Sequence, residues 1–316
     1  MIDPLAQVVG LLRPSASFSK LTQGAGHWRV RRTESGRPFY CVVLDGSCRL
    51  TVGGGDPIIL ETHDFVLIPA AYQFTMSSIE PMPPGAADTA PVELRPGEFL
   101  LGSPDQPPEV RSLIGYCAFG SPDAALLLSL LPQLVHVRGE RRLSTLVQLV
   151  NEESRSLRPA REVILAHLLE VLLIEALRST TLSAGSPGLL RGLGDDRIAA
   201  ALRGIHDRPA LPWTVAQLAK EAALSRSTFF ERFRQAVGVA PMEYLLQWRM
   251  ALAKDMLRRR DGGIAAVAER VGYSSASTFS VAFTRHVGVP PTVYARRQDE
   301  GEMELSDQVP AAGPDA

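Results

Sequence analysis

The stretch that decides the fold reads VAQLAKEAALSRSTFFERFRQAVGVAP at residues 215–241. It returns as IAAVAERVGYSSASTFSVAFTRHVGVPP at residues 264–291. The offset between the copies is 49 residues as far as Ser225 and Ser274, and 50 residues from Thr228 and Thr278 onward. The second copy therefore carries one extra residue near its turn, and the chain contains the same unit twice.

Each copy predicts two helices joined by a tight turn. Apolar residues in the first half recur at i, i+3, i+4 and i+7, the single buried stripe of a short helix: Val215, Leu218, Ala219, Ala222 and then Ile264, Val267, Ala268, Val271. Gly272 suits a turn residue with positive φ, and Ser225 or Ser274 is placed to cap the next helix. Two inward phenylalanines, four apart, follow in each copy. This pattern is the helix-turn-helix, whose second helix enters the DNA major groove.

Residues 241–260 predict a helix between the copies, with Pro241 near its start and the run Asp261-Gly262-Gly263 as its stop. About twenty residues at 1.5 Å each give roughly 30 Å. That length approaches the pitch of B-DNA, about 34 Å, so the helix could set two recognition helices into successive turns of the major groove.

The charge of this block supports DNA binding. Residues 213–298 contain thirteen Lys and Arg against six Asp and Glu, a net +7, whereas the whole chain carries −1. A local basic excess on a near-neutral protein is the electrostatic footprint of a DNA-binding domain. The alternative, a helical bundle without a DNA role, does not explain two matched copies enriched in arginine.

The double motif resembles the C-terminal DNA-binding domain of the AraC/XylS family of bacterial transcription regulators. The resemblance covers roughly 85 residues and is most specific over residues 272–294, including Phe279, Phe283, Gly288 and Pro291. Two positions depart from the family pattern. Thr284 stands where a base is common, and Pro290 replaces the usual Ser or Thr before Pro291.

The resemblance places base-edge contacts at the outer positions of both recognition helices: Ser227, Phe230, Glu231, Ala276, Ser277, Ser280 and Val281. Phe230 and Val281 can contact thymine methyl groups, and Glu231 can accept from cytosine. We expect Arg226 and Arg234 to contact phosphates, the alternative being solvated charges. Operator DNA and RNA polymerase are the partners that the resemblance implies.

Length and composition indicate two domains in a 316-residue chain, without a leader sequence or an apolar run of membrane length. The cysteines, Cys41, Cys48 and Cys117, show no CxxC spacing. These features favour a cytoplasmic protein without structural disulfides.

The first half predicts short strands separated by Gly, Pro and Asp, which is typical of a small β-barrel: residues 27–31, 39–44, 49–52, 58–60, 65–68, 74–76, 99–101 and 112–119. A turn is expected at Asp45-Gly46, and the proline-rich segment Glu80–Pro96 is expected to be a flexible loop.

Hairpins between residues 39 and 69 resemble the cupin sensor domain of AraC-family proteins. The histidine pair of metal-binding cupins is replaced by Tyr40-Cys41-Val42, so no metal, no cofactor and no enzyme activity are expected. His27 and His63 are expected at the surface or in a turn.

Alternating strand residues face a barrel interior, so a small-molecule site would be lined by some of Trp28, Phe39, Cys41, Val43, Tyr72 and Phe74. The alternative is that these side chains fill a closed core.

The segment around Cys117 is similar to that of a cupin-bearing AraC subgroup that senses reactive chlorine by cysteine oxidation. Cys117 is thus a candidate trigger, with Cys41 or Cys48 as resolving partners if their Cα atoms lie within about 7 Å; burial as a small hydrophobic residue is the alternative.

Residues 161–182 predict a helix that is apolar nearly all round. It should pack on the barrel with one side and on a partner with the other, either a second copy in a homodimer or the rest of the monomer. The predicted fold is therefore α+β: a cupin-like sensor and dimerisation domain (1–182), a linker (183–194), an all-α domain with two helix-turn-helix motifs (195–298) and a disordered acidic tail (299–316).

We interpret the protein as a sequence-specific transcription regulator that responds to a small molecule or an oxidant. The alternatives are a metal-dependent cupin enzyme fused to an accessory helical domain, and a DNA-packing protein that is indifferent to sequence.

Overall fold

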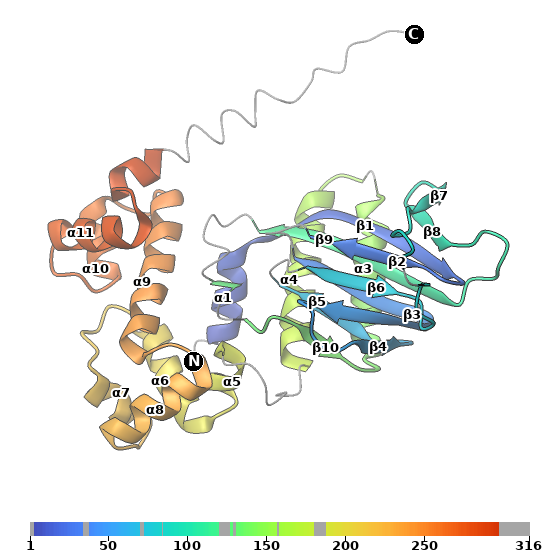
Figure 1. Ribbon diagram of the computed structural model, residues 1–316. Coiled ribbons are helices and arrows are strands. Elements are labelled where there is room, and N and C mark those ends of the chain that lie inside the picture. The colour runs from blue at the N-terminus through green and yellow to red at the C-terminus, as the bar shows by residue number, and fades with distance from the viewer. Residues whose placement is uncertain are drawn as a thin grey trace, which may run out of the picture. The chain divides into compact units, whose positions relative to one another are not determined.

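The computed structural model describes residues 3–33, 38–69, 73–83, 85–119, 127–128, 131–156, 158–179 and 188–296. The chain divides into two compact units, one comprising Leu5–Gly194 and the other beginning at Asp195 (Figure 1). Among the described residues, no helix combines the length and the hydropathy needed to span a membrane. The predicted acidic tail and Tyr72 lie outside the described residues.

The first unit is a β-barrel built from two walls of strands. One wall runs in the order β10-β5-β3-β9-β1-β8-β7, and the other contains β4, β6 and β2 together with the second half of β3. The strands are β1 (Pro14–Ala25), β2 (Arg29–Arg32), β3 (Phe39–Val52), β4 (Ile58–Glu61), β5 (Phe65–Ile68), β6 (Phe74–Ser77), β7 (Val92–Arg95), β8 (Glu98–Gly102), β9 (Val110–Phe119) and β10 (Val135–Val137).

Strand β3 joins the two walls, and the turn predicted at Asp45-Gly46 is wrong. The first half of β3 pairs with β5 and β9, and the second half pairs with β4 and β6. At the crossing point the ladder with β9 shifts register, and Gly46 has φ +78°. A Cβ at Gly46 would lie 1.8 Å from the carbonyl oxygen of Glu109, so the bend requires glycine for space as well as for conformation.

Three strands are absent from the sequence prediction. Strand β1 pairs with β9 over ten residue pairs and runs parallel to β8. Strand β7 lies inside the segment Glu80–Pro96 that was expected to be a loop, and it pairs with β8. Strand β10 pairs with β5. Strands β1 and β10 are held by partners that are distant in sequence, which local patterns do not reveal. Strand β7 forms a hairpin with the adjacent β8, inside a segment whose prolines favoured a loop.

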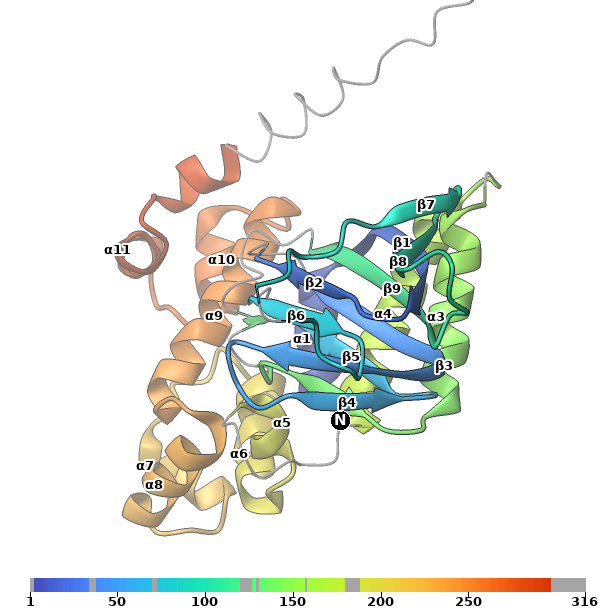
Figure 2. The ribbon, with the colours of Figure 1, turned by 45° about the vertical axis from the view of Figure 1, so that its right-hand side comes forward.

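Helices cover one face of the larger wall. Helix α1 (Pro4–Leu12) precedes the strands, and α3 (Arg141–Ser154) and α4 (Arg161–Ser179) lie on the outer side of β1, β3 and β9 (Figures 1 and 2). Helix α4 buries one stripe, namely Leu165, Leu169, Leu172, Leu173, Ala176 and Leu177. It leaves Val163, Ile164 and Val171 exposed, so the helix is neither fully buried nor apolar only on its inner face.

A short helix, α5 (Leu189–Leu193), occupies part of the predicted linker. The second unit then contains α6 (Asp196–Asp207), α7 (Val215–Glu221), α8 (Arg226–Val237), α9 (Pro241–Arg258), α10 (Ile264–Arg270) and α11 (Ala276–Val287). Helix α9 connects the α6–α8 group at one end to α10 and α11 at the other (Figure 1). Its 18 residues correspond to about 27 Å.

In each copy of the motif, a serine side chain caps the N-terminus of the second helix. Ser225 accepts a hydrogen bond from the backbone N–H of Thr228 at 3.2 Å, and Ser275 accepts from Thr278 at 3.1 Å. The cap of the second copy is therefore Ser275, and the prediction of Ser274 is wrong, because the extra residue lies between Gly272 and the cap. Gly272 has φ +82°, as its place in the turn predicted. Pro290 does not prevent the last helical turn, since its carbonyl accepts from the N–H of Tyr294 at 2.9 Å.

Candidate nucleic-acid interface and barrel cavity

The first recognition helix, α8, is oriented by its two inward phenylalanines. Phe229 and Phe233 are fully buried with ring centroids 5.5 Å apart, and Phe233 meets Tyr244 of α9 edge-on. The opposite face is thereby turned to solvent. It carries all five residues expected on this helix, of which Phe230 is half-buried and the other four are exposed: Arg226, Ser227, Phe230, Glu231 and Arg234.

The second recognition helix, α11, repeats this arrangement with a less charged face. Val281 is 71% exposed, Ser277 is exposed, and Ala276 and Ser280 are half-buried. The Ser280 hydroxyl donates to the Ala276 carbonyl at 2.7 Å, so it can offer only acceptor capacity to a base. Arg285 is exposed on the same face and was missed; the spacing of Ser277, Val281 and Arg285 at i, i+4 and i+8 is the signal that could have found it.

The basic residues divide into two sets. Arg232 pairs with Asp195 at 2.5 Å, Arg208 with Glu221 at 3.2 Å, and Arg270 with Asp261 at 3.0 Å. By contrast, Arg226 and Arg234 form no ion pair with the described residues. Arg232 is thus engaged within the fold, whereas the arginines at the predicted interface are available to phosphates.

Hydrogen bonds from Arg249 connect the two helix-turn-helix copies. The Arg249 guanidinium on α9 donates to the carbonyls of Pro209 and Leu211, at 2.8 and 2.7 Å, in the loop before α7. Gly272 also lies against this group, since a Cβ there would meet Arg249 Nη2 at 2.6 Å and the Ala210 carbonyl oxygen at 2.7 Å. The loop of the first copy and the turn of the second copy therefore pack together, and α9 is not the only connection between them.

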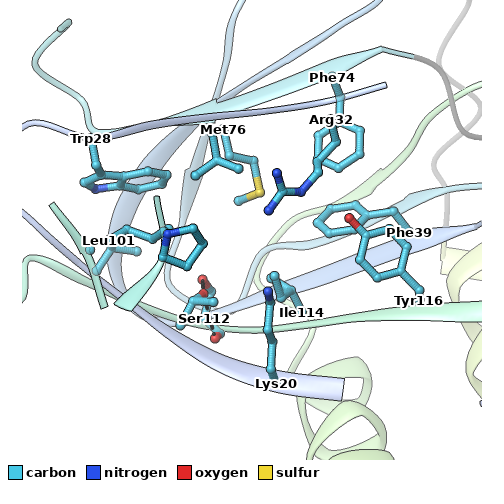
Figure 3. A pocket seen from close by; sticks show the side chains of 15 residues that line it. Lys20, Trp28, Arg32, Phe39, Phe74, Met76, Leu101, Ser112, Ile114 and Tyr116 are labelled. Atoms are coloured by element: carbon cyan, nitrogen blue, oxygen red, sulfur yellow. Dashed lines mark hydrogen bonds between the residues drawn. The ribbon is translucent and has the colours of Figure 1, made fainter. Parts of the chain in front are cut away.

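The barrel contains a cavity that shares part of its lining with the packed core. Figure 3 shows its walls, which come from β1, β2, β3, β6, β8 and β9. The cavity is narrow, with a volume of about 40 Å³. Trp28, Phe39 and Phe74 line the cavity as the strand alternation predicted, whereas Cys41 and Val43 belong to the packed core.

Polar groups enter the cavity at two places. Lys20 of β1 and Arg32 of β2 reach into it from opposite walls (Figure 3). The buried hydroxyls of Thr22 and Ser112 lie 2.9 Å apart on the same wall as Lys20. Lys20 and Thr22 were missed because β1 was not recognised, so the inward side of its residues was unknown. Arg32 lies one residue beyond the strand predicted at residues 27–31, and Ser112 is the first residue of the strand predicted at residues 112–119.

The structure does not bring the predicted redox residues together. Cys41 and Cys48 lie inside the barrel, but Cys117 follows the inward Tyr116 and faces the other side of the wall. Cys41 pairs across from Ile114, three residues before Cys117 in β9. Burial raises the pKa of Cys41 well above the usual value and raises the pKa of Cys48 and Cys117 to about 12 each, so all three thiols are protonated at neutral pH.

The described residues contain no group of three or more His, Cys, Asp or Glu side chains that could hold a metal ion. His27 is exposed, and His63 lies in a turn with φ +70°, as predicted for both.

A helical unit with two braced helix-turn-helix motifs, following a barrel with a narrow cavity, defines a two-part DNA-binding protein. Comparison with known proteins agrees. Residues 3–181 match the family model "Cupin", and residues 218–297 match "Helix-turn-helix domain". The chain belongs to the AraC family of DNA-binding transcription regulators, in the group that carries an N-terminal cupin domain.

Similar proteins support this assignment over nearly the whole chain. A putative AraC-like transcription regulator of Streptomyces lividans is 36% identical over 306 residues, which cover 93% of this chain and 98% of that protein. The HTH-type transcriptional regulator AlkR of Acinetobacter baylyi is 28% identical over 94% of this chain and 100% of that protein. The crystal structure of the AdpA DNA-binding domain with a target DNA is 30% identical, covers 31% of this chain and 89% of that chain, and has a TM-score of 0.30. The Streptomyces and Acinetobacter relatives are transcription regulators and not enzymes, which removes the cupin-enzyme alternative.

Proposed function

We propose that this regulator reads its operator with α8 and α11 and changes its DNA binding when a small molecule occupies the barrel cavity. The observation that carries the proposal is the pairing of two solvent-facing recognition helices with a cavity that the barrel's own side chains leave unfilled. Because it acts on DNA, the proposal places the protein in the cytoplasm, with RNA polymerase as its protein partner.

Base readout is proposed at the outer residues of both helices. Phe230 and Val281 offer apolar contacts to thymine methyl groups, and Glu231 offers an acceptor to cytosine. Arg226 and Arg234, joined by Arg285 of α11, are proposed to contact phosphates, which position the protein without reading sequence. Selection of operators from random DNA should yield two blocks spaced by about one helical turn.

Glu231→Ala is expected to change sequence preference at one or two base pairs, because it removes one acceptor worth about 1–3 kcal/mol of discrimination. The selection is repeated with the variant and compared with the wild type. Glu243→Ala is the matched control, since Glu243 is an exposed glutamate of α9 outside the recognition helices. A uniform change of affinity for every sequence in both variants would show that Glu231 acts only through its charge.

A homodimer is proposed through α4, where Val163, Ile164 and Val171 form an apolar patch that the monomer leaves uncovered. The apolar pattern of residues 161–182 predicts Leu169 as an outward position, and this prediction is wrong. Leu169 is 1% exposed, so a charge there would disrupt the core instead. Val171→Glu is expected to convert a dimer to a monomer, measured by light scattering at micromolar concentration. Ile59→Glu, a change of an equally exposed residue on β4, should leave the dimer intact; a monomeric wild type would end the proposal.

The small molecule has a rival in oxidation of Cys117. The cavity favours the molecule, because the Cys117 thiol is 1% exposed and its raised pKa disfavours the reactive thiolate. Hypochlorous acid treatment separates the two. A change of operator affinity in the wild type that is lost in Cys117→Ser would establish the oxidative trigger, and equal responses in both would exclude it.

A further inference from the structure

Helix α9 divides between two packing groups near its middle. Tyr244 meets a buried ring of α8 edge-on, with ring centroids 5.9 Å apart. Trp248 stacks on His206 of α6 with a centroid distance of 4.0 Å. The buried side chains of Met250 and Leu257 lie instead in the small core that α9 shares with α10 and α11. A bend or twist of α9 between these two groups would therefore change the placement of α11 relative to α8.

The side chain of Arg249 spans this division. Its Nε and Nη2 atoms donate to the carbonyls of Pro209 and Leu211, at 2.8 and 2.7 Å, in the loop that leads into α7. Its guanidinium carbon lies 5.9 Å from the centre of the Tyr273 ring, which belongs to the turn of the second copy. One side chain therefore contacts both helix-turn-helix motifs at the point where α9 passes from one to the other.

Both contact points are connected directly to helices. The Leu211 carbonyl also accepts from the backbone N–H of Trp213 at 2.7 Å, immediately before the residue that caps α7. In the second copy, the Tyr273 ring packs edge-on against Phe279 of α11, with centroids 5.6 Å apart. Each contact of Arg249 therefore restrains a helix-turn-helix motif and not only a loop.

The two copies approach each other so closely at Gly272 that a side chain there would collide with both. A Cβ at this position would lie 2.6 Å from Arg249 Nη2 and 2.7 Å from the Ala210 carbonyl oxygen. A charged guanidinium makes hydrogen bonds that are roughly twice as strong as those between neutral groups. The contact through Arg249 therefore resists separation of the two copies.

We propose that Arg249 is a positioning residue that sets the spacing of the two operator blocks, because it holds α8 and α11 at one separation. This inference rests on the proposed function, since spacing matters only if both helices read DNA. Each base pair inserted between the blocks moves them about 3.4 Å apart and rotates them by about 35°, because a turn of about 34 Å contains about 10 base pairs. Two motifs held as one body cannot follow that change, whereas two loosely connected motifs can.

The first test measures affinity for operators whose blocks lie at the selected spacing, or at one base pair more or less. The wild type is expected to lose at least about 10-fold in affinity at either altered spacing, because the contacts of one block are misplaced. Arg249→Met removes the donors and keeps an apolar stem, so this loss is expected to shrink to less than about 3-fold. Arg249→Lys keeps the charge but not the planar fork, so its loss should lie between the two.

Arg259→Met is the matched control, because Arg259 is an exposed arginine at the end of α9 that pairs with Asp255 of the same helix. It removes the same charge, so its affinity should change equally at every spacing. A loss of fold stability alone would also lower affinity at every spacing and leave the ratios unchanged. An unchanged spacing preference in Arg249→Met, or a wild type that binds all three spacings alike, would overturn the proposal.

A measurement without DNA separates this inference from the proposed function. Spin labels are attached at Lys220→Cys on α7 and Glu269→Cys on α10, two exposed residues at equivalent positions of the copies, while the native cysteines are buried. In the full chain, diluted with unlabelled protein, the distribution of label distances should be narrow in the wild type and Arg259→Met and broader in Arg249→Met. Should Arg249→Met fail to fold, Arg249→Lys takes its place.

The outcomes of this measurement are distinct. Equal widths in all three proteins would overturn the positioning role of Arg249, even if the operator is read as proposed. Broadening in Arg249→Met, together with a wild type that selects no operator, would support the positioning role and contradict the proposed function.

Discussion

Replacing Phe279 by alanine is expected to destabilise the second helix-turn-helix by about 3–5 kcal/mol, the usual loss for a buried phenylalanine. The Phe279 ring is fully buried and packs on Tyr273 and Phe283, with centroid distances of 5.6 and 5.4 Å. These rings hold α11 against α9 and α10 in a small separate core. Domain stabilities are themselves about 5–15 kcal/mol, so operator binding should fall together with the helical signal in a urea titration.

The matched control is Val281→Ala on the same helix. Val281 is 71% exposed, so this change is expected to alter stability by less than about 0.5 kcal/mol. Any effect on operator binding should then depend on the base pair that α11 contacts. Equal destabilisation by both substitutions would show that α11 is not packed as described.

Lowering the pH from about 7.5 to about 5 is expected to destabilise the second unit by about 2 kcal/mol through His206. The His206 ring stacks on Trp248 at 4.0 Å between centroids, and its Nε2 lies 2.7 Å from the Tyr244 hydroxyl. Burial lowers the pKa of His206 to about 3, against about 6.5 in the unfolded chain. Between these two pKa values, His206 is protonated in the unfolded chain but stays neutral in the folded protein. The free energy of unfolding therefore falls as the pH falls from about 6.5 toward 3.

The measurement is urea unfolding of the full chain, followed by far-UV circular dichroism at both pH values. His206→Gln lacks the titrating ring and should lose about 2 kcal/mol of the pH dependence, although its absolute stability will also be lower. The exposed His286 provides the control, since His286→Gln should retain the wild-type pH dependence. An unchanged pH dependence in His206→Gln would show that His206 is not buried in the neutral form.

The helices of the second unit were largely predictable because their signals are local. The spacing of Leu218 and Ala219, or of Val267 and Ala268, marks a buried stripe within one short helix, and these residues are at most 3% exposed. The serine caps and the glycine turn act over three or four residues. The one error, Ser274 for Ser275, arose where one copy carries an extra residue and only the backbone path decides which hydroxyl reaches the helix.

The strands were harder to predict because pairing partners are distant in sequence. Strand β1 contains mostly Ser, Ala, Gly and other residues of low β-propensity, and it is a strand because β9 and β8 lie on its two sides. A local pattern divided β3 at Gly46, whereas the structure bends it from one wall to the other. Lys20 could not be assigned to the barrel interior while β1 was unknown.

The sequence by itself determined that this protein has two helix-turn-helix motifs joined by one helix. The apolar periodicity, the helix caps and the inward phenylalanine pairs that indicate these motifs each lie within a short segment of the chain. Tertiary structure alone decided the cavity and the separation of Cys117 from the cysteines inside the barrel. Both depend on which strands pair and which way their residues face, and a side chain's face is defined only once its strand has neighbours. Lys20 and Arg32 line one cavity because the consecutive strands β1 and β2 belong to different walls of the barrel, which only the strand pairing decides.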